Sequence, residues 1–190
     1  MKTRFLTAIT ALALATITLQ AQTVAIDVPR STIKWEAKKV VGQHNGEISL
    51  KSGSLTLKNK NIVAGEFIVD MKTIKDSDLP AGEWNDKLVG HLNSDDFFGT
   101  AKFPESKLEI LSATPLDAKG SSEIKGKLTI KNIEQPITFT ANVNGKNYNA
   151  TLTIDRTKYD IKYGSGQFFE GLGDKMISDT FTLEISLITK

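Results

Sequence analysis

The sequence predicts an all-β fold, an antiparallel barrel or sandwich of about eight strands with one short helix. Three observations support this prediction. A series of segments alternates apolar and polar residues with period two, which is typical of strands with one buried side. Short turn signals join several of these segments. One segment, residues 83–93, instead has the apolar spacing of an amphipathic helix.

The first 21 residues are predicted to be a secretory signal peptide. Lys2 and Arg4 precede an apolar run from Phe5 to Leu19, and small or polar residues follow it. The run is shorter than the roughly 20 residues that a membrane-spanning helix needs. We expect cleavage after Ala21, which leaves residues 22–190 as one domain in the periplasm or outside the cell.

Charge and cysteine content exclude several classes of function. Without Lys2 and Arg4, the chain balances 22 basic against 22 acidic residues. This balance gives no electrostatic reason to expect nucleic acid or an anionic membrane as partner. The sequence contains no cysteine, which excludes disulfides, thiol nucleophiles, cysteine-based metal sites and a lipoprotein anchor.

The strands follow one another along the mature chain. Two turn signals divide them: Ser52-Gly53 predicts a tight turn, and Asn144-Gly145 is a strong hairpin signal. The alternating segments are 33–38, 48–50, 55–57, 67–71, 108–110, 124–130, 137–143, 148–154 and 181–187. Closing such strands into a barrel would remove the edges that otherwise invite aggregation.

The helical segment carries an apolar stripe and leads into paired aromatic residues. Trp84, Leu88, His91 and Leu92 are spaced i, i+4, i+7 and i+8 and predict one face packed on a sheet or over a barrel mouth. An acidic loop with Phe97-Phe98 follows. A lone helix with paired aromatics is what a small barrel needs to close over an apolar interior. This favours a binding protein over an enzyme.

Several polar residues have both a structural and a functional interpretation. Arg156 could form a salt bridge at a barrel rim, or it could hold an acidic or phosphorylated headgroup, and Lys38 and Lys39 have the same two interpretations. The two histidines, His44 and His91, could join carboxylates in a metal or heme site, but no ligand spacing supports one. We therefore predict no metal and no cofactor.

Spaced motifs along the mature chain resemble the YceI-like family of exported, lipocalin-like, polyisoprenoid-binding proteins. They are Asp27-Val28-Pro29 with Ser31 and Trp35; His91, Leu92, Ser94, Asp96, Phe97 and Phe98 with Pro104; and Gly126 to Lys131 with Pro136 to Phe139. The resemblance implies an eight-stranded antiparallel lipocalin-like barrel over residues 22–190, with a helix over one end. It also implies an apolar tunnel that holds a long-chain isoprenoid or related lipid in the periplasm.

On this basis we expect a lipid carrier whose ligand is an isoprenoid, a quinone precursor or a fatty acid derivative. The predicted ligand-binding residues are Trp35, Phe67, Val69, Met71, Trp84, Leu88, His91, Phe97, Phe98, Phe169 and Arg156.

Other functions stay open at this point. The barrel could have a filled core and act through its surface as a stress-associated or partner-binding protein. An enzyme on a lipid substrate, with His91 and Asp96 as acid–base pair, and a heme or electron-transport accessory are further alternatives. Exposed Phe168-Phe169 could pair two subunits into a homodimer. We expect no stable membrane insertion.

Overall fold

The computed structural model describes residues 20–190, so residues 1–19 of the predicted signal peptide lie outside the described residues. The described chain forms nine strands, one α-helix and three short 3-10 helices. The strands are β1 Gln22–Ala25, β2 Thr32–Lys39, β3 Gln43–Lys58, β4 Asn61–Asp76, β5 Glu105–Ala113, β6 Ser121–Ile130, β7 Ile133–Asn144, β8 Asn147–Asp155 and β9 Ile177–Ile188. The helices are α1 Glu83–Asn93, η1 Val28–Arg30, η2 Arg156–Tyr159 and η3 Gly173–Lys175.

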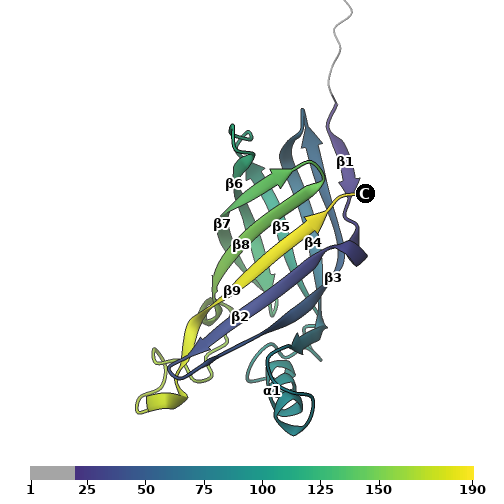
Figure 1. The fold of residues 1–190 in the computed structure, drawn as a ribbon. Coiled ribbons are helices and arrows are strands. Elements are labelled where there is room, and N and C mark those ends of the chain that lie inside the picture. The colour runs from purple at the N-terminus through teal and green to yellow at the C-terminus, as the bar shows by residue number, and fades with distance from the viewer. Residues whose placement is uncertain (1–19) are drawn as a thin grey trace, which may run out of the picture.

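Eight of the strands close into an antiparallel barrel (Figure 1). The strand order is β1-β3-β2-β9-β8-β7-β6-β5-β4, and a further pairing of β3 with β4 closes the ring. β1 is the extra strand. It pairs with the second half of β3, Val24 opposite Leu55, whereas β2 pairs with the first half, Ile33 opposite Ile48. The predicted antiparallel barrel with one short helix is therefore confirmed.

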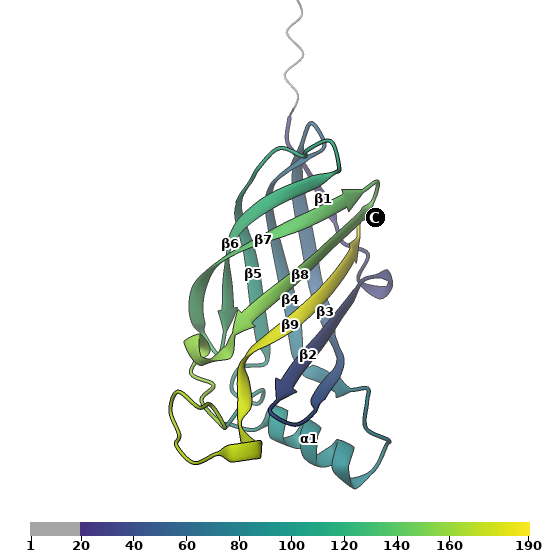
Figure 2. The same cartoon turned by 60° about the vertical axis from the view of Figure 1, so that its left-hand side comes forward.

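The two ends of the barrel differ. α1 and the long β8–β9 connection lie at one end, and β1 and the C-terminus lie at the other (Figures 1 and 2). The chain between β4 and β5 crosses the first end and includes α1. We call this the α1 end and the other the β1 end. Within residues 20–190, no helix has the length and apolar character needed to cross a membrane.

Inward and outward residues alternate as the period-two pattern predicts. On β6, for example, Ile124, Leu128 and Ile130 are buried, whereas Lys125 between them is exposed. Inward apolar side chains from all strands of the ring form one continuous hydrophobic cluster. The barrel interior is therefore mostly apolar.

The predicted tight turn at Ser52-Gly53 is wrong. Both residues lie inside β3, which continues to Lys58 and pairs with β4. Glycine is needed there for close packing, since a Cβ on Gly53 would lie 2.8 Å from the Phe67 ring. The hairpin instead turns at Asn59-Lys60, whose φ angles of 53° and 67° are typical of a type I′ turn.

The Asn144-Gly145 hairpin signal is confirmed. β7 ends at Asn144, β8 begins at Asn147, and these two residues pair. Gly145 has a φ of 60°, which glycine adopts without strain. The turn fixes the register in which Tyr148 and Val143 face each other across the two strands.

Candidate ligand-binding cavity

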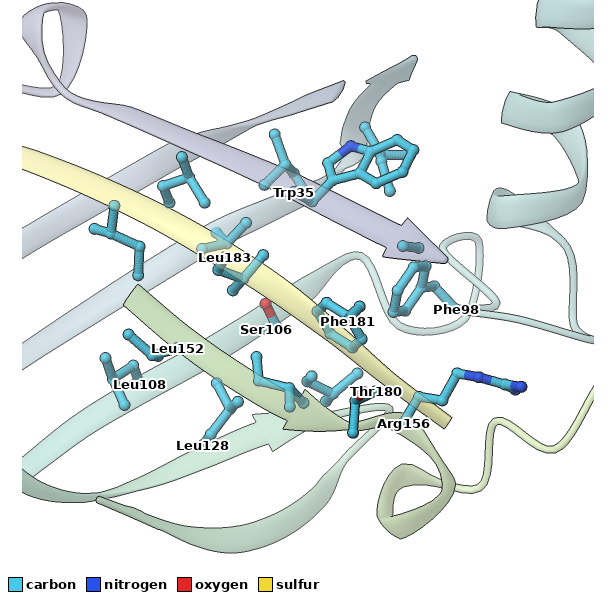
Figure 3. A pocket seen from close by; sticks show the side chains of 18 of the residues that line it. Trp35, Phe98, Ser106, Leu108, Leu128, Leu152, Arg156, Thr180, Phe181 and Leu183 are labelled. Carbon is cyan, nitrogen blue, oxygen red and sulfur yellow. The ribbon is translucent and has the colours of Figure 1, made fainter. Parts of the chain in front are cut away.

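The barrel encloses an apolar cavity of about 490 Å³ (Figure 3). All eight strands of the ring and α1 contribute lining residues. The volume lies within the range of small-molecule sites, and such sites are mostly apolar with a few polar groups. In Figure 3, Leu108, Leu128 and Leu152 lie in one part of the cavity, and Arg156 lies on the side toward the helix.

The β1 end of the cavity is closed to solvent. Its lining includes Leu55, Ile62, Ile110 and Ile124, which are all at most 5% exposed. These are branched apolar side chains without a hydrogen-bonding group. A ligand group at this depth would therefore lose its water without gaining a polar partner, which only a hydrocarbon tolerates well.

The α1 end provides the opening and most of the polar lining. Lys38, Lys39, Tyr163, Asp174 and Lys175 line the cavity there, and all five are exposed to solvent. Lys38 and Lys39 end β2, and the other three belong to the β8–β9 connection. We call this opening the mouth of the cavity. A ligand that enters through it would keep a polar group near these side chains.

Local hydrogen bonds after α1 turn the paired phenylalanines inward. The Phe97 N–H donates to the Ser94 carbonyl at 3.1 Å, and the Phe98 N–H donates to the Leu92 carbonyl at 3.1 Å. The Thr100 hydroxyl donates to Asn93 Oδ1 at 2.7 Å and closes the turn. Both rings are 8% exposed and line the cavity.

The rings form an aromatic cluster beneath the mouth. The His91 ring lies edge-on to Tyr163 at 4.4 Å and to Phe97 at 5.3 Å between centroids. Phe98 is edge-on to Phe181 of β9 at 6.3 Å. This cluster joins α1 and the segment after it to β9 and to the β8–β9 connection, so it holds that segment in place over the interior.

Arg156 lies at the cavity wall and is only 2% exposed. Its Nε donates to the Ser178 carbonyl at 2.9 Å, and its Nη1 donates to the Ile161 carbonyl at 2.8 Å. Nη2 donates to the Ile177 carbonyl at 3.1 Å and lies 3.6 Å from Asp179 Oδ1. The predicted salt bridge is confirmed, and the guanidinium also fastens η2 to the start of β9.

The guanidinium keeps a face toward the interior. Its Cζ lies 5.7 Å from the centroid of the Phe97 ring, a cation–π distance. Burial lowers the pKa of Arg156, while the Asp179 carboxylate opposes this effect. The group therefore brings a charge to an apolar wall that is otherwise suited to a hydrocarbon.

The structure brings together nine of the eleven predicted ligand-binding residues. The cavity is lined by Trp35, Phe67, Val69, Met71, Leu88, His91, Phe97, Phe98 and Arg156. The Trp35 indole N–H is satisfied by the Lys75 carbonyl at 3.1 Å, so its ring can face the interior without an unpaired donor.

Trp84 and Phe169 lie elsewhere, which corrects the prediction. Trp84 is 72% exposed, because only the last turns of α1 pack on the barrel and Leu92 is its buried residue. Its ring instead lies near Lys87 Nζ, at 4.8 Å. Phe169 is 50% exposed on the β8–β9 connection and is not among the residues that line the cavity.

Sequence reasoning missed part of the site. Tyr163, Lys175 and the other mouth residues of the β8–β9 connection come from a segment without periodicity, so no pattern signals their position. Phe181 and Leu183 were predicted as inward residues of a strand, and the same alternation could have marked them as cavity lining.

His91 and Asp96 do not form an acid–base pair. His91 is packed between aromatic rings, whereas Asp96 is exposed on the outer side of the turn. Among residues 20–190, no hydrogen bond or ion pair joins the two. The two side chains are therefore not in contact, and the proposed pairing of His91 with Asp96 is not observed.

His44, Asp76 and Asp78 form a cluster beside the cavity, with one potential ligand atom from each within 4.8 Å of the others. His44 Nδ1 lies 2.9 Å from Asp78 Oδ2, and the Asn45 N–H donates to Asp78 Oδ1 at 2.8 Å. The Leu79 N–H donates to Asp76 Oδ2 at 2.9 Å. Three such groups could contact a divalent cation, but His44 and Asp78 also fasten the chain after β4 to the start of β3, and Asp76 holds the loop before α1.

The two carboxyls of this cluster titrate in opposite directions. Burial raises the pKa of Asp76, and its Oδ1 is buried without a hydrogen-bond partner among the described residues. Burial also acts to raise the pKa of Asp78, but hydrogen bonds from the Asn45 N–H and from neighbouring side chains outweigh it and lower this pKa. All three side chains already have hydrogen-bond partners within the protein, so we assign the cluster a structural role.

Solved structures with the same fold cover nearly the whole described chain. BcnA of Burkholderia cenocepacia is 16% identical with a TM-score of 0.67, over 87% of this chain and 99% of that one. A polyisoprenoid binding domain from Saccharophagus degradans, implicated in plant cell wall breakdown, is 14% identical with a TM-score of 0.59, over 91% of this chain and 99% of that one. At these identities the likeness shows the fold alone.

Curated relatives are more similar in sequence. A UPF0312 protein of Pseudomonas putida is 26% identical over 147 residues, which are 71% of this chain and 67% of that protein. A UPF0312 protein of Staphylococcus aureus is 36% identical over 90 residues, which are 42% of this chain and 49% of that protein. The model of the YceI-like domain matches residues 25–188, which include every strand of the ring and the cap over the cavity. The chain belongs to the YceI-like family.

Proposed function

We propose that this protein is an exported carrier that holds a long-chain isoprenoid or a related lipid in the barrel, and that it binds this lipid without chemical change. The observation that carries the proposal is the apolar cavity of about 490 Å³, closed at the β1 end and open at the α1 end. The name of the Saccharophagus degradans neighbour, a polyisoprenoid binding domain, supports the same class of ligand.

Burial of hydrocarbon is sufficient to bind such a ligand. Each CH₂ group removed from water contributes roughly 0.8 kcal/mol. Since association costs about 4–15 kcal/mol, a tail of roughly 20 carbons in the cavity offsets this cost even without a specific hydrogen bond. This is why ligand class follows from the lining, whereas headgroup identity does not.

The position of the polar lining gives the orientation. The tail would lie among Leu55, Ile110 and Ile124 at the closed end, and the headgroup would lie near Lys39 and Lys175 at the mouth. Isoprenoids, quinone precursors and fatty acid derivatives all have this division into a long tail and a polar end. The enclosed cavity favours this carrier function over the alternative of a barrel that is filled by side chains and acts through its surface.

The proposal is tested by native mass spectrometry of the protein purified from the compartment to which it is exported. Organic extraction and lipid identification follow on the same sample. We expect a bound lipid in stoichiometric amount, with a long hydrocarbon tail. A protein that carries no lipid, and takes up none after incubation with isoprenoids and fatty acids, would overturn the carrier function.

Export is tested separately. We propose that residues 1–21 are removed, so the N-terminal sequence of the purified protein should begin at Gln22. A protein that retains Met1 and stays in the cytoplasm would contradict export while leaving the lipid result to be judged on its own.

A further inference from the structure

Large exposed apolar side chains gather around the mouth of the cavity. Among residues 20–190, seven of the nine such side chains lie at the α1 end, and Val63 and Leu111 are the two on the barrel wall toward the β1 end. Those nearest the mouth form what we call the rim. The rim consists of Val40, Val41, Tyr163, Phe168, Phe169 and Met176.

The rim is built by ordered backbone contacts. The Val40 N–H donates to the Met176 carbonyl at 3.1 Å, which ties the β2–β3 turn to the β8–β9 connection. The N–H groups of Phe168 and Phe169 both donate to the carbonyl of Ser165 at 3.1 Å, and Ser165 itself is fully buried. The turn is thus anchored inside while the two phenyl rings, 47% and 50% exposed, face outward.

Positive charge accompanies the apolar rim. Lys38, Lys39 and Lys175 line the mouth against a single acid, Asp174. Lys38 pairs with Glu36 at 3.2 Å, whereas Lys39 and Lys175 take part in no ion pair among the described residues. Lysines therefore outnumber acids among the residues that line the mouth, while Glu170 is exposed beside Phe169 on the same connection.

We propose that the rim docks onto a lipid bilayer with anionic headgroups, so that the mouth of the cavity faces the lipid. Exposed aromatic and aliphatic side chains bind by insertion at the headgroup boundary, and lysines beside them are attracted to anionic lipids. This inference rests on the proposed function, because a lipid ligand has to leave a membrane before it enters the cavity. If the mouth docks on the bilayer, the hydrocarbon tail of the ligand can enter the cavity without being exposed to water.

The lysines at the mouth also favour a membrane over a second copy of the protein as the partner that covers the rim. A two-fold pair through Phe168 and Phe169 would place the same face of each subunit against the other. The unpaired Lys39 and Lys175 of both subunits would then lie in the same interface, which would concentrate like charge there. Anionic headgroups instead neutralise them.

The test measures co-sedimentation with vesicles. Protein expressed from the full sequence and recovered in the soluble fraction is mixed with vesicles of equal parts phosphatidylethanolamine and phosphatidylglycerol, or of phosphatidylcholine alone. We expect binding to the anionic vesicles that weakens as salt increases.

Three variants separate the contributions. Phe168→Ser with Phe169→Ser should weaken binding to anionic vesicles about ten-fold, because each exposed ring loses its insertion. Lys39→Gln with Lys175→Gln should weaken it about five-fold for each lysine. Leu111→Ser is the matched control: it removes a side chain that is 54% exposed away from the mouth and should bind as the wild type does. Unfolding midpoints confirm that each variant folds.

Each contrary outcome has a definite meaning. Wild-type protein that binds neither vesicle, or phenylalanine variants that bind as the wild type does, would overturn the docking proposal. So would a dimer in sedimentation velocity that the phenylalanine variant dissociates, because the rim would then face a second copy. Lipid extraction tests the carrier function separately. A protein that binds vesicles but never holds lipid would support docking and overturn the carrier function. A protein that holds lipid but binds no vesicles would support the carrier function and overturn docking.

Discussion

At the scale of the residue, Arg156 shows how a charge can be kept in a wall of apolar side chains. The sequence allowed a salt bridge or a headgroup site, and the guanidinium makes three hydrogen bonds to backbone carbonyls besides approaching Asp179. These bonds satisfy most of its donors. The residue therefore connects η2, the residues after it and β9, and contributes to the fold whether or not a headgroup lies nearby.

The variant Arg156→Met should be about 3 kcal/mol less stable than the wild type, because the buried carbonyl groups lose their hydrogen-bond donors. Arg156→Lys keeps the charge but not the planar geometry that reaches several carbonyls, so it should lose less. Urea unfolding of both variants checks this. Wild-type stability in Arg156→Met would show that the guanidinium serves the ligand alone.

Tyr159 gives a prediction about alkaline pH. It is 3% exposed, and burial followed by the nearby Asp155 carboxylate raises its pKa to about 12. The folded protein therefore holds this proton above the ordinary tyrosine pKa of about 10, at which the unfolded chain releases it. Stability is unaffected below about pH 10 and falls as pH rises toward 12, by about 2–3 kcal/mol in all.

The variant Tyr159→Phe cannot lose this proton. Its stability should decline less than that of the wild type between pH 10 and pH 12, as measured by unfolding midpoints at each pH. Ultraviolet absorbance of the phenolate gives an independent reading, because Tyr159 should titrate above the ordinary range. Parallel pH profiles for the two proteins would contradict the prediction.

At the scale of the element, the strands were predictable, whereas of their connections the Asn144-Gly145 hairpin was predicted correctly and others were not. Alternation in segments such as 124–130 reflects which side of the wall faces the interior, so it identifies both the strand and its inward residues. The turn at Asn59-Lys60 was not predicted, because lysine is not a typical turn residue. The backbone nevertheless holds Lys60 at positive φ. The connection 156–176 has no period, so its position at the mouth had no sequence signal.

The helix marks a second limit. Its apolar stripe predicted a face packed along its whole length, but Trp84 in the first turn projects into solvent and only the last turns cover the barrel. The stripe shows which side of a helix can pack, not how far the neighbouring wall extends. By contrast, Phe97 and Phe98 line the cavity as predicted, because backbone hydrogen bonds to Ser94 and Leu92 turn both residues inward.

The Asn59-Lys60 turn can be strengthened. Lys60 has a φ of 67°, and glycine adopts this conformation without strain. Lys60→Gly creates the preferred Asn-Gly type I′ turn and should raise the free energy of unfolding by up to about 1 kcal/mol. Thermal unfolding checks this. Lys146→Gly is the control in the β7–β8 turn: the φ of Lys146 is not positive, so glycine there should bring no gain.

At the scale of the whole molecule, the number of strands makes a cavity possible. An eight-stranded barrel has an interior just wide enough to be filled by side chains or to hold one small ligand. The sequence predicted that the interior is either filled or hollow, but not which of the two. The volume left inside depends on the sizes of the inward residues and on the register that places them side by side. Small residues such as Ala141 and Ala150 on neighbouring strands β7 and β8 leave the space that larger ones would fill.

Filling that space tests the cavity and the carrier together. Ala150 lines the cavity, and its neighbour Thr151 is exposed on the outer side of β8. In Ala150→Phe the new ring should enter the empty interior, so the protein should lose less than the 1–3 kcal/mol that overpacking of a dense core typically costs. Its content of extracted lipid should fall several-fold, because ring and tail compete for the same volume. Thr151→Phe adds the same ring outside and should keep both stability and lipid.

The two readouts together separate the possible states of the interior. A loss of stability in Ala150→Phe as large as in a dense core would mean that side chains already fill the barrel, which favours a protein that acts through its surface. Unchanged stability with unchanged lipid would place the ligand away from Ala150, toward the mouth and Phe98. Unchanged stability with lost lipid is the result expected of a barrel whose inner volume is reserved for a hydrocarbon tail.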